Sequence, residues 1–408
     1  MANAIITPTI IAKEALMQVE NNLVMGNNVH REYKNEFVKV GATVNIRKPV
    51  KFVVSDGAVR VHQDVEEANT SIVVNQRKHV SWAFATQDLT LSIEDFSERY
   101  IKPAAIVLAN NVDAALTGLY KDVWNWVGTA GQTVNSYADF ALAPRRMDEG
   151  AVPRDARRAV IGPADHWGLL GSQTGLFMER IAEGAYREGS LGRLGGVDTF
   201  MDQNVSTHTT GATAVGTPLT DGAGQETTYA LSKTTNTQSL GTDGWTTLKS
   251  FAAGDVFTID TVFAVNPVSK AKLDYLQQFV ITTAATAHAT TTADTDFTIA
   301  PAIITSGPYQ NVNVTTVPDG ATITMIGTAA TAYPQNLVFH KNAFALVTVP
   351  LEMPDGVSFK ARESHKGLSI RVLKQFDIDN DEDVIRLDIL YGVKSIFPDL
   401  ATRLSGTA

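Results

Sequence analysis

The densest group of potential metal ligands in this 408-residue chain lies near its C-terminal end. The aspartates and the asparagine of this run are Asp377, Asp379, Asn380, Asp381, Asp383 and Asp388. Oxygen ligands at such short spacing are typical of calcium-binding loops. An EF-hand loop that begins at Asp377 requires Gly at its sixth position and Glu at its twelfth, where this chain has Glu382 and Asp388. Because strand-like residues flank the run, we interpret it as a solvated acidic turn between two strands.

The other chemistry-bearing residues do not form a catalytic or phosphate-binding pattern. The glycine-rich run at 189–196 lacks both the dinucleotide spacing and the Lys-Ser/Thr pair of a P-loop, which favours a flexible or tightly turned loop. Ser190 is not in a nucleophile elbow, because Glu188 stands where that motif has its first Gly. The chain has 8 scattered histidines and no cysteine. We therefore predict no catalytic residue, no metal site and no cofactor.

A charged segment between predicted strands supplies the best candidate contact residues. Strands are predicted at 41–50, 71–74 and 79–84, and the charged connection between the first two turns at Ser55-Asp56-Gly57. An isolated hairpin is marginally stable in water, so a neighbouring subunit is the expected support for this one. The candidate inter-subunit residues are Lys48, Lys51, Asp56, Arg60, Glu66 and Glu67, with Asp64 between them. The alternative is a solvated hairpin without partners.

The element that must position this hairpin is a long helix predicted from Ser92 to Trp126. Apolar residues recur there at gaps of three and four, and the span is about 35 residues, roughly 52 Å. Ser92 is its expected N-cap, with Asp95 in the first turn, and Gly128 is its expected C-terminal residue. Pro103 is expected to kink or split it. Such a helix requires a long partner surface, most simply an extended sheet.

Composition restricts the class of protein. The net charge is −9 and the sequence pI is about 5.4, which argues against tight nucleic-acid binding. Residues 1–40 form an arm with balanced charges and a helix at 9–23, unlike the basic arms that condense nucleic acid. No apolar run reaches the roughly 20 residues of a membrane span, and no basic segment precedes the apolar N-terminal residues, so neither a membrane helix nor a signal peptide is expected.

The chain is long enough for two or three domains, and its pattern changes along its length. Residues 129–207 mix helices, predicted at 137–149, 164–170 and 177–186, with strands at 157–162 and 197–205. This mixture indicates an α+β fold.

A second pattern begins near His208. To about Pro334 the chain is rich in Thr, Ala and Gly and has short strand candidates, which indicates an inserted small β barrel or sandwich. The candidates are VFTIDTVFAV, QFVIT, DFTIA, VNVTTV and ATITMIG. Strands then return at 337–339, 344–349, 368–376 and 384–391.

Four segments, in this order, carry a resemblance to a known family. They are LANNV (108–112), GAYREGSLGRLGGVDTF (184–200), FAAGDVFTIDTVFAVNP (251–267) and RLDILYGVKSIFPDLATRL (386–404). The ordered set resembles the major capsid protein of tailed double-stranded-DNA phages, which has the Hong Kong 97-type fold. The inserted β domain is similar to that of the Salmonella-podovirus coat proteins.

The resemblance implies a division of the α+β chain into parts. These are an N-terminal arm (1–40), an extended hairpin (41–90), a spine helix (91–128), a first axial part (129–207), an inserted β barrel (208–334) and returning strands (335–408).

The resemblance also implies a function and partners. Copies of the chain would assemble into an icosahedral shell of pentamers and hexamers that encloses motor-packaged DNA, without catalysis. A scaffolding protein is expected to be separate, because no cleavable stretch precedes the arm, and a portal is expected at one vertex. DNA contact would be non-specific, and a decoration protein is left open. The expected location is the virion, with assembly in the cytoplasm of the host bacterium, and no Lys–Asn crosslink is expected.

Three other functions remain as alternatives. The Thr-rich β segment is compatible with an adhesion or glycan-binding protein, which leaves the long helix unexplained. A hydrolase that uses Asp, Glu and His would require a motif that the sequence lacks. A cellular nanocompartment shell has the same fold, and the inserted β segment argues against it.

Overall fold

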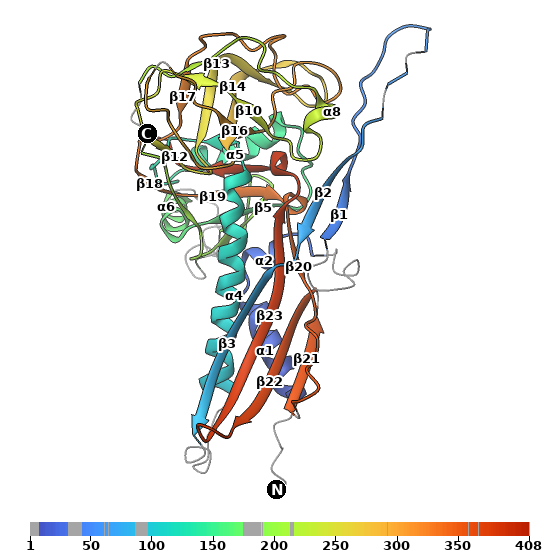
Figure 1. The fold of residues 1–408 in the computed structure, drawn as a ribbon, viewed down its shortest axis with the longest axis vertical. Helices are drawn as coiled ribbons and strands as arrows, with labels where there is room; N and C mark the ends of the chain where they lie inside the picture. Colours follow the sequence, from blue (N-terminus) through green and yellow to red (C-terminus); the bar gives the residue numbers. More distant parts are fainter. Residues whose placement is uncertain are drawn as a thin grey trace. The chain divides into compact units, whose positions relative to one another are not determined.

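A computed structural model describes most of the chain. The described residues are 8–31, 43–60, 62–63, 65–85, 97–173, 189, 191–212, 216–291, 293–357, 359–365 and 367–407. The chain forms two compact units, each built from segments that are far apart in sequence (Figure 1). Unit 1 comprises Met1–Asn45, Ser71–Leu116 and Phe344–Lys394, and unit 2 comprises Ile46–Thr70, Thr117–Ala343 and Ser395–Ala408.

The core of unit 1 is an antiparallel sheet of five strands. Its strands are β3 (Gln76–Ala85), β20 (Phe344–Thr348), β21 (Phe359–His365), β22 (Leu368–Asp377) and β23 (Glu382–Ser395). The strand β23 lies between β3 and β22, in a register that pairs Tyr391 with Gln76 and Asp388 with Arg371. The strands predicted at 79–84, 344–349, 368–376 and 384–391 are confirmed. The strand β21 was not predicted, because only one of its seven side chains, Ala361, is buried.

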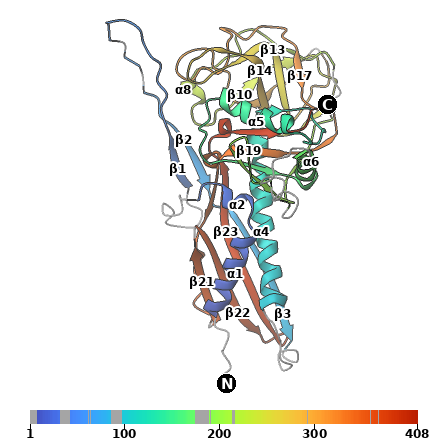
Figure 2. The same cartoon turned by 180° about the vertical axis from the view of Figure 1, so that it is seen from behind.

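Two helices cover one face of this sheet, as Figures 1 and 2 show from opposite sides. Helix α1 (Pro8–Asn22), predicted at 9–23, packs its apolar side against β21 and β22. Helix α4 (Lys102–Thr117) is tied to β23, because the hydroxyl of Tyr391 donates a hydrogen bond of 2.8 Å to Oδ1 of Asn111. The carboxylate of Asp113 joins α4 to the segment after α1 by accepting the backbone N–H groups of Val24 and Gly26 at 2.7 and 2.8 Å. The expected sheet partner of the long helix is confirmed.

The long helix, in its described part, is less regular than predicted and ends earlier, at Asp122. It consists of a π-helical turn at Ser97–Ile101, α4 itself and a 3-10 turn at Gly118–Asp122. Pro103 is the second residue of α4, where its missing N–H costs nothing, so the expected split takes the form of a change from π to α geometry. The predicted cap, Ser92 and Asp95, lies outside the described residues.

The predicted C-terminal end of this helix is wrong. Trp126 is not helical, because Trp126–Val127 forms the strand β4. Gly128 has a φ of +87°, and a Cβ there would lie 2.0 Å from the backbone oxygen of Ser405. Glycine is therefore required at position 128 because the backbone of Ser405 lies close to it, and not because a helix ends there.

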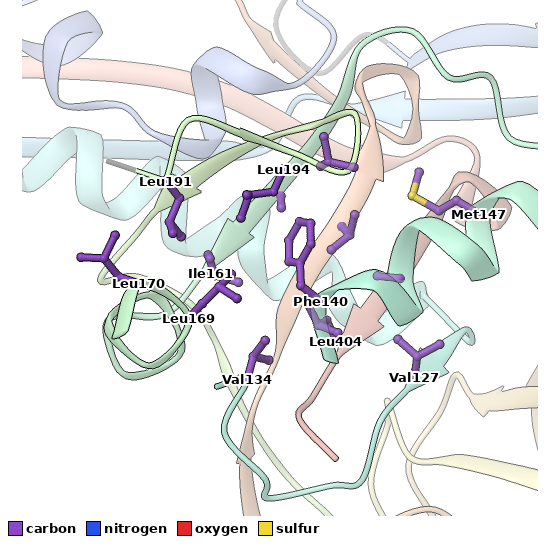
Figure 3. Close-up of a cluster of buried hydrophobic side chains, with 14 of the residues drawn as sticks. Val127, Val134, Phe140, Met147, Ile161, Leu169, Leu170, Leu191, Leu194 and Leu404 are labelled. Atoms are coloured by element: carbon purple, nitrogen blue, oxygen red, sulfur yellow. The ribbon is translucent and has the colours of Figure 1, made fainter. Parts of the chain in front are cut away.

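The main sheet of unit 2 is mixed and has six strands in the order β4-β24-β19-β5-β7-β6. The strands besides β4 are β5 (Arg157–Ile161), β6 (Arg193–Leu194), β7 (Val197–Met201), β19 (Asn336–His340) and β24 (Ala401–Leu404). Helices α5 (Tyr137–Glu149) and α6 (Pro163–Gln173) pack on it, with Phe140, Ile161 and Leu404 in the shared core (Figure 3). The predictions at 137–149, 157–162, 164–170 and 337–339 are confirmed, whereas the strand predicted at 197–205 ends at Met201. The helix predicted at 177–186 lies outside the described residues.

The glycine-rich run forms a tight hairpin in the part that the structure describes. Gly195 and Gly196 have φ values of +54° and +82° and connect β6 directly to β7. A two-residue hairpin turn of type I′ requires a positive φ at both of its central residues. The turn interpretation is therefore confirmed for 191–201, while Ser190 and Glu188 are not among the described residues.

The Thr-rich segment has its own sheet and core. Its first strand, β8 (Thr207–Thr209), pairs with its last, β18 (Ala332–Pro334). Between them lies an antiparallel sheet of five strands in the order β10-β16-β14-β13-β17. These strands are β10 (Gln238–Leu240), β13 (Val256–Val265), β14 (Lys272–Ile281), β16 (Phe297–Ala300) and β17 (Ile323–Met325). The rings of Trp245 and Phe251 meet edge to face at 4.7 Å in the core of this segment.

Four of the five strands predicted in this segment are confirmed. The exception is VNVTTV, where Val312 makes only an isolated bridge to Ala264. The remaining short elements of the described chain are α2 (Met25–Asn28), α8 (Tyr229–Ser232), β9 (Leu219–Thr220), β11 (Thr242–Asp243), β12 (Ser250–Phe251) and β15 (Ala285–Thr286). The closure of the segment into a barrel and the six-part division of the chain stay predictions.

An extended loop leaves unit 2 between two short paired strands. These are β1 (Thr43–Lys48) and β2 (Ala68–Val73), and the loop comprises residues 49–67 (blue in Figure 1). Gly57, with a φ of +100°, turns the chain where the sequence predicts a turn. The side chain of Gln63 joins the two arms of the loop by accepting the N–H of Val53 at 2.9 Å and donating to its carbonyl.

Candidate functional site

The predicted contact residues are distributed along the extended loop instead of gathering at one point. Asp56 and Arg60 flank the turn at Gly57, are exposed, and form no ion pair with any described residue. Lys51 and Glu67 are exposed near the base of the loop, where Glu67 lies 3.4 Å from Arg47. The loop therefore presents both signs of charge to its surroundings.

The base of the extended loop is fastened to the Thr-rich segment of the same chain. The hydroxyl of Tyr309 accepts the backbone N–H of Lys51 at 3.1 Å and donates to the backbone oxygen of Glu66 at 3.4 Å. Nζ of Lys233 lies 3.2 Å from Oε2 of Glu66. Tyr309 also stacks on Tyr229 at 3.4 Å, and burial, with the hydrogen bond to Tyr309, raises the pKa of Tyr229. These contacts hold the loop where it leaves the unit.

Sequence reasoning missed this clamp. Glu66, a predicted inter-subunit contact residue, has an ion-pair partner in its own chain, Lys233, and its contact with a neighbouring subunit stays a prediction. Tyr309 lies more than two hundred residues after the loop, in the connection between β16 and β17 of the Thr-rich segment. No local signal connects residues so distant, so only the tertiary structure reveals the contact.

A cavity of about 440 Å³ lies beside the clamp, within unit 2. Lys48 at the end of β1 and Lys51 of the loop line it, and Arg146 lines it from α5. Nζ of Lys48 lies 5.9 Å from the ring centroid of Phe397, another lining residue. The cavity therefore combines basic and aromatic side chains.

A second group of charged residues is buried at the root of the Thr-rich segment. The imidazole of His208, on β8, binds Asp255 and the hydroxyl of Tyr120 through its two ring nitrogens. The guanidinium of Arg403, on β24, lies 5.1 Å from the ring centroid of Tyr120 and donates to the backbone oxygen of Gly254 at 2.8 Å. Burial lowers the pKa of Arg403 to about 9, so the side chain is charged at neutral pH. No local pattern in the sequence indicates this group, because its members come from four separate segments.

Asp388 belongs to a buried ion pair rather than to the acidic turn. It lies well inside β23, is 0% exposed, and binds Arg371 of β22 through Nε at 3.2 Å and Nη2 at 2.5 Å. Arg386 donates to its other oxygen at 2.7 Å. Its inclusion among candidate calcium ligands is therefore wrong, since both of its oxygens are occupied by guanidinium groups.

Asp379, Asn380 and Asp381 form the solvated turn that the sequence predicts, whereas Asp383 lies on β23. Asp377 accepts the amide of Asn380 at 2.9 Å and the backbone N–H of Asp379 at 3.1 Å, and these hydrogen bonds lower its pKa. No group of three or more His, Asp or Glu side chains that could hold a metal ion occurs in the described part of the chain. None of the described helices is long and apolar enough to cross a bilayer.

The combination of these features defines a class of protein. A long helix along an antiparallel sheet, an extended loop and a mixed sheet with packed helices form the Hong Kong 97-type fold of tailed-phage major capsid proteins. The family model described as P22 coat protein, gene protein 5, matches residues 1–406. The chain therefore belongs to the P22 coat protein family, and its role is that of a structural subunit of a phage capsid.

Solved structures are similar to this chain in fold and distant in sequence. The structure titled Mycobacterium phage Che8 is 16% identical, with a TM-score of 0.50, and the match covers 93% of this chain and 90% of that one. The capsid of the cyanophage P-SCSP1u is 12% identical over 91% of this chain and 86% of that one, with a TM-score of 0.43. A virus-like particle from Pyrococcus furiosus is 8% identical over 97% of both chains, with a TM-score of 0.38. No curated protein matches.

Proposed function

We propose that copies of this chain form an icosahedral shell of pentamers and hexamers that encloses double-stranded DNA delivered by a motor. The observation that carries the proposal is the family match over residues 1–406. The extended loop agrees with it, because residues 49–60 are almost entirely exposed and a loop without a core of its own is best supported by a neighbour. The chain itself performs no catalysis in this proposal and uses no cofactor.

The proposed partners follow from the same role. A separate scaffolding protein directs assembly in the cytoplasm of the host bacterium, and a portal occupies one vertex. Contact with DNA is non-specific and weak, because a chain with a net charge of −9 repels phosphate. A decoration protein on the outer surface stays open.

Within the shell, we propose that the exposed charges of the extended loop pair with charges of the adjacent subunit. Asp56, Arg60 and Lys51 are the principal candidates, because none of their side chains has an ion-pair partner among the described residues. Glu66 contributes less, since Lys233 of its own chain already binds it. Each contact is weak when exposed, and a closed shell sums many of them.

The test is assembly of the purified chain, alone and with a candidate scaffolding protein, followed by sedimentation and negative-stain microscopy. We expect uniform closed shells in the presence of scaffold. A compact monomer that stays unassembled at high concentration under both conditions would contradict the proposal. Shells that are boiled in denaturant should run as monomers on a gel, because we propose no covalent crosslink; a ladder of oligomers would show one.

A further inference from the structure

The cavity at the base of the extended loop has an excess of positive charge. Its basic lining residues are Lys48, Lys51, Arg146 and Lys233. Of the described residues that line it, Asp399 alone is acidic. A recess lined by one sign of charge concentrates its field and attracts the opposite charge.

One guanidinium in this lining has unused hydrogen-bonding capacity. Nη1 of Arg146 is buried and has no hydrogen-bond partner among the described residues. The guanidinium carbon lies 3.5 Å from the centroid of the Tyr275 ring. The tyrosine and the charge of Glu149 both act on this side chain, but Nη1 receives no hydrogen-bond acceptor from either. A buried donor without an acceptor is costly, and a carboxylate is the planar acceptor that matches a guanidinium best.

The chain's own carboxylates neutralise this region only in part. The charge of Glu149 acts on Arg146, and Asp399 lies in the lining of the cavity. Nζ of Lys270 donates to the backbone oxygens of Pro308 and Gln310 at 2.6 and 3.2 Å and meets no carboxylate there. Burial, followed by the charge of Lys51, lowers the pKa of Lys270 to about 8. Glu66 of the extended loop, which reaches this region, is bound to Lys233.

We propose that this cavity receives an acidic side chain from a second copy of the chain, whose carboxylate binds Arg146 and Lys51. The inference rests on the proposed function, which places copies side by side with the extended loop at their contact. A chain with 43 acidic and 34 basic residues supplies carboxylates on its neighbouring surfaces. The volume of about 440 Å³ accommodates a few side chains, whereas a DNA duplex is too wide to enter.

Isotope-resolved crosslinking tests the source of the carboxylate. Shells are assembled from an equal mixture of chains with natural nitrogen and with nitrogen-15, and a carbodiimide then couples carboxylates to lysine amines without a spacer. We expect peptides in which Lys51 is joined to an Asp or Glu of the other isotope, in shells and not in the unassembled chain. The pair of Lys233 and Glu66 serves as an internal control, since it should couple within one copy in both samples.

Either of two results would overturn the inference. One is coupling of Lys51 to its own copy only, and the other is coupling to the scaffolding protein only. If the wild-type chain forms no shells, the proposed function fails, and this inference fails with it. If shells form without mixed-isotope peptides at Lys51, this inference alone fails.

A matched pair of variants tests the role of the guanidinium. Arg146→Gln removes the proposed ligand, and Arg145→Gln removes the adjacent arginine of α5, whose side chain is 69% exposed and pairs with Glu149. We expect Arg146→Gln to raise the concentration required for assembly about tenfold, because one charge-assisted hydrogen bond is lost. We expect Arg145→Gln to leave this concentration within about twofold of the wild-type value. Equal assembly of the two variants, both folded by circular dichroism, would count against the proposal. The crosslinking result on the wild-type chain stands even if Arg146→Gln does not fold.

Discussion

Nε2 of His208 lies 2.8 Å from Oδ1 of Asp255, and the two side chains are only 2% and 1% exposed. His208 belongs to β8, where the Thr-rich segment begins, and Asp255 directly precedes β13, a strand of the five-stranded sheet of that segment. The other oxygen of Asp255 accepts backbone N–H groups from Gly211 and Ala252 at 3.1 and 2.8 Å. This pair therefore fixes the start of the segment to its main sheet.

Replacing His208 by Ala should destabilise the chain by about 3 kcal/mol, because the change leaves the Asp255 carboxylate buried without its imidazole partner. Urea unfolding followed by circular dichroism measures the loss. His288→Ala is the matched control, since His288 is exposed and its imidazole forms a hydrogen bond to Thr290, a residue of the same surface loop. Similar stabilities for the two variants would contradict the structural role of the His208–Asp255 pair.

The buried ion pair of unit 1 gives a second prediction. Asp388→Asn should cost about 3 to 5 kcal/mol, because Arg371 would stay buried without a counter-charge. Asp383→Asn, which breaks the partly exposed pair between Asp383 and Lys374 at 3.0 Å, should cost about 1 kcal/mol or less. The two variants are compared by their urea midpoints. A lower midpoint for Asp383→Asn than for Asp388→Asn would contradict the greater contribution of the buried pair.

His340 should make stability fall in mild acid. Burial lowers its pKa below the ordinary value of 6.5, despite the charge of Asp155 at 3.8 Å, and its Nδ1 accepts the N–H of Asn342. Below about pH 6.5 the unfolded chain binds a proton that the folded chain resists, so the free energy of unfolding declines. We expect His340→Gln to lose less stability than the wild type between about pH 7.5 and about pH 5.5. If the free energy of unfolding falls equally with pH in both proteins, His340 is not the cause of the acid destabilisation.

Charge reversal on the extended loop separates assembly from folding. Lys51→Glu with Arg60→Glu should impair shell formation and change the stability of the monomer by less than about 0.5 kcal/mol, because both side chains are exposed. Lys51→Arg with Arg60→Lys keeps the charges and is the control. Sedimentation and microscopy give the readout. If the reversed variant assembles like the control, the loop charges do not act between subunits.

The Thr-rich segment should stabilise the rest of unit 2. Thr209 pairs with Ala332, so an Asn-Gly turn between them can replace residues 210–331. The excision removes Gln278, whose amide binds the backbone N–H and C=O of Trp126 at 2.7 and 2.8 Å. We expect a loss of at least about 2 kcal/mol from these unpaired groups, visible as a lower urea midpoint. A fully stable excised chain that forms normal shells would contradict this role.

Local patterns determined a large part of this structure. The apolar spacing of 137–149 predicted α5 to the residue, because Ser136 caps it and Gly150 ends it within the same stretch of chain. The acidic turn after Asp377 and the glycine turn at 195–196 were also predicted, since each depends only on neighbouring residues. The order of the parts along the sequence was enough to indicate the capsid family.

Other features were decided only by the tertiary structure. The long helix ends before Trp126 because the backbone there is bound by Gln278 and pairs with Arg403 on β24, which lie more than one hundred and fifty residues away. The clamp of Tyr309 on the extended loop and the buried contacts of Arg403 have the same origin. Hydrogen bonds and ion pairs between distant segments leave no periodicity in the sequence, because their partners are brought together only when the chain folds.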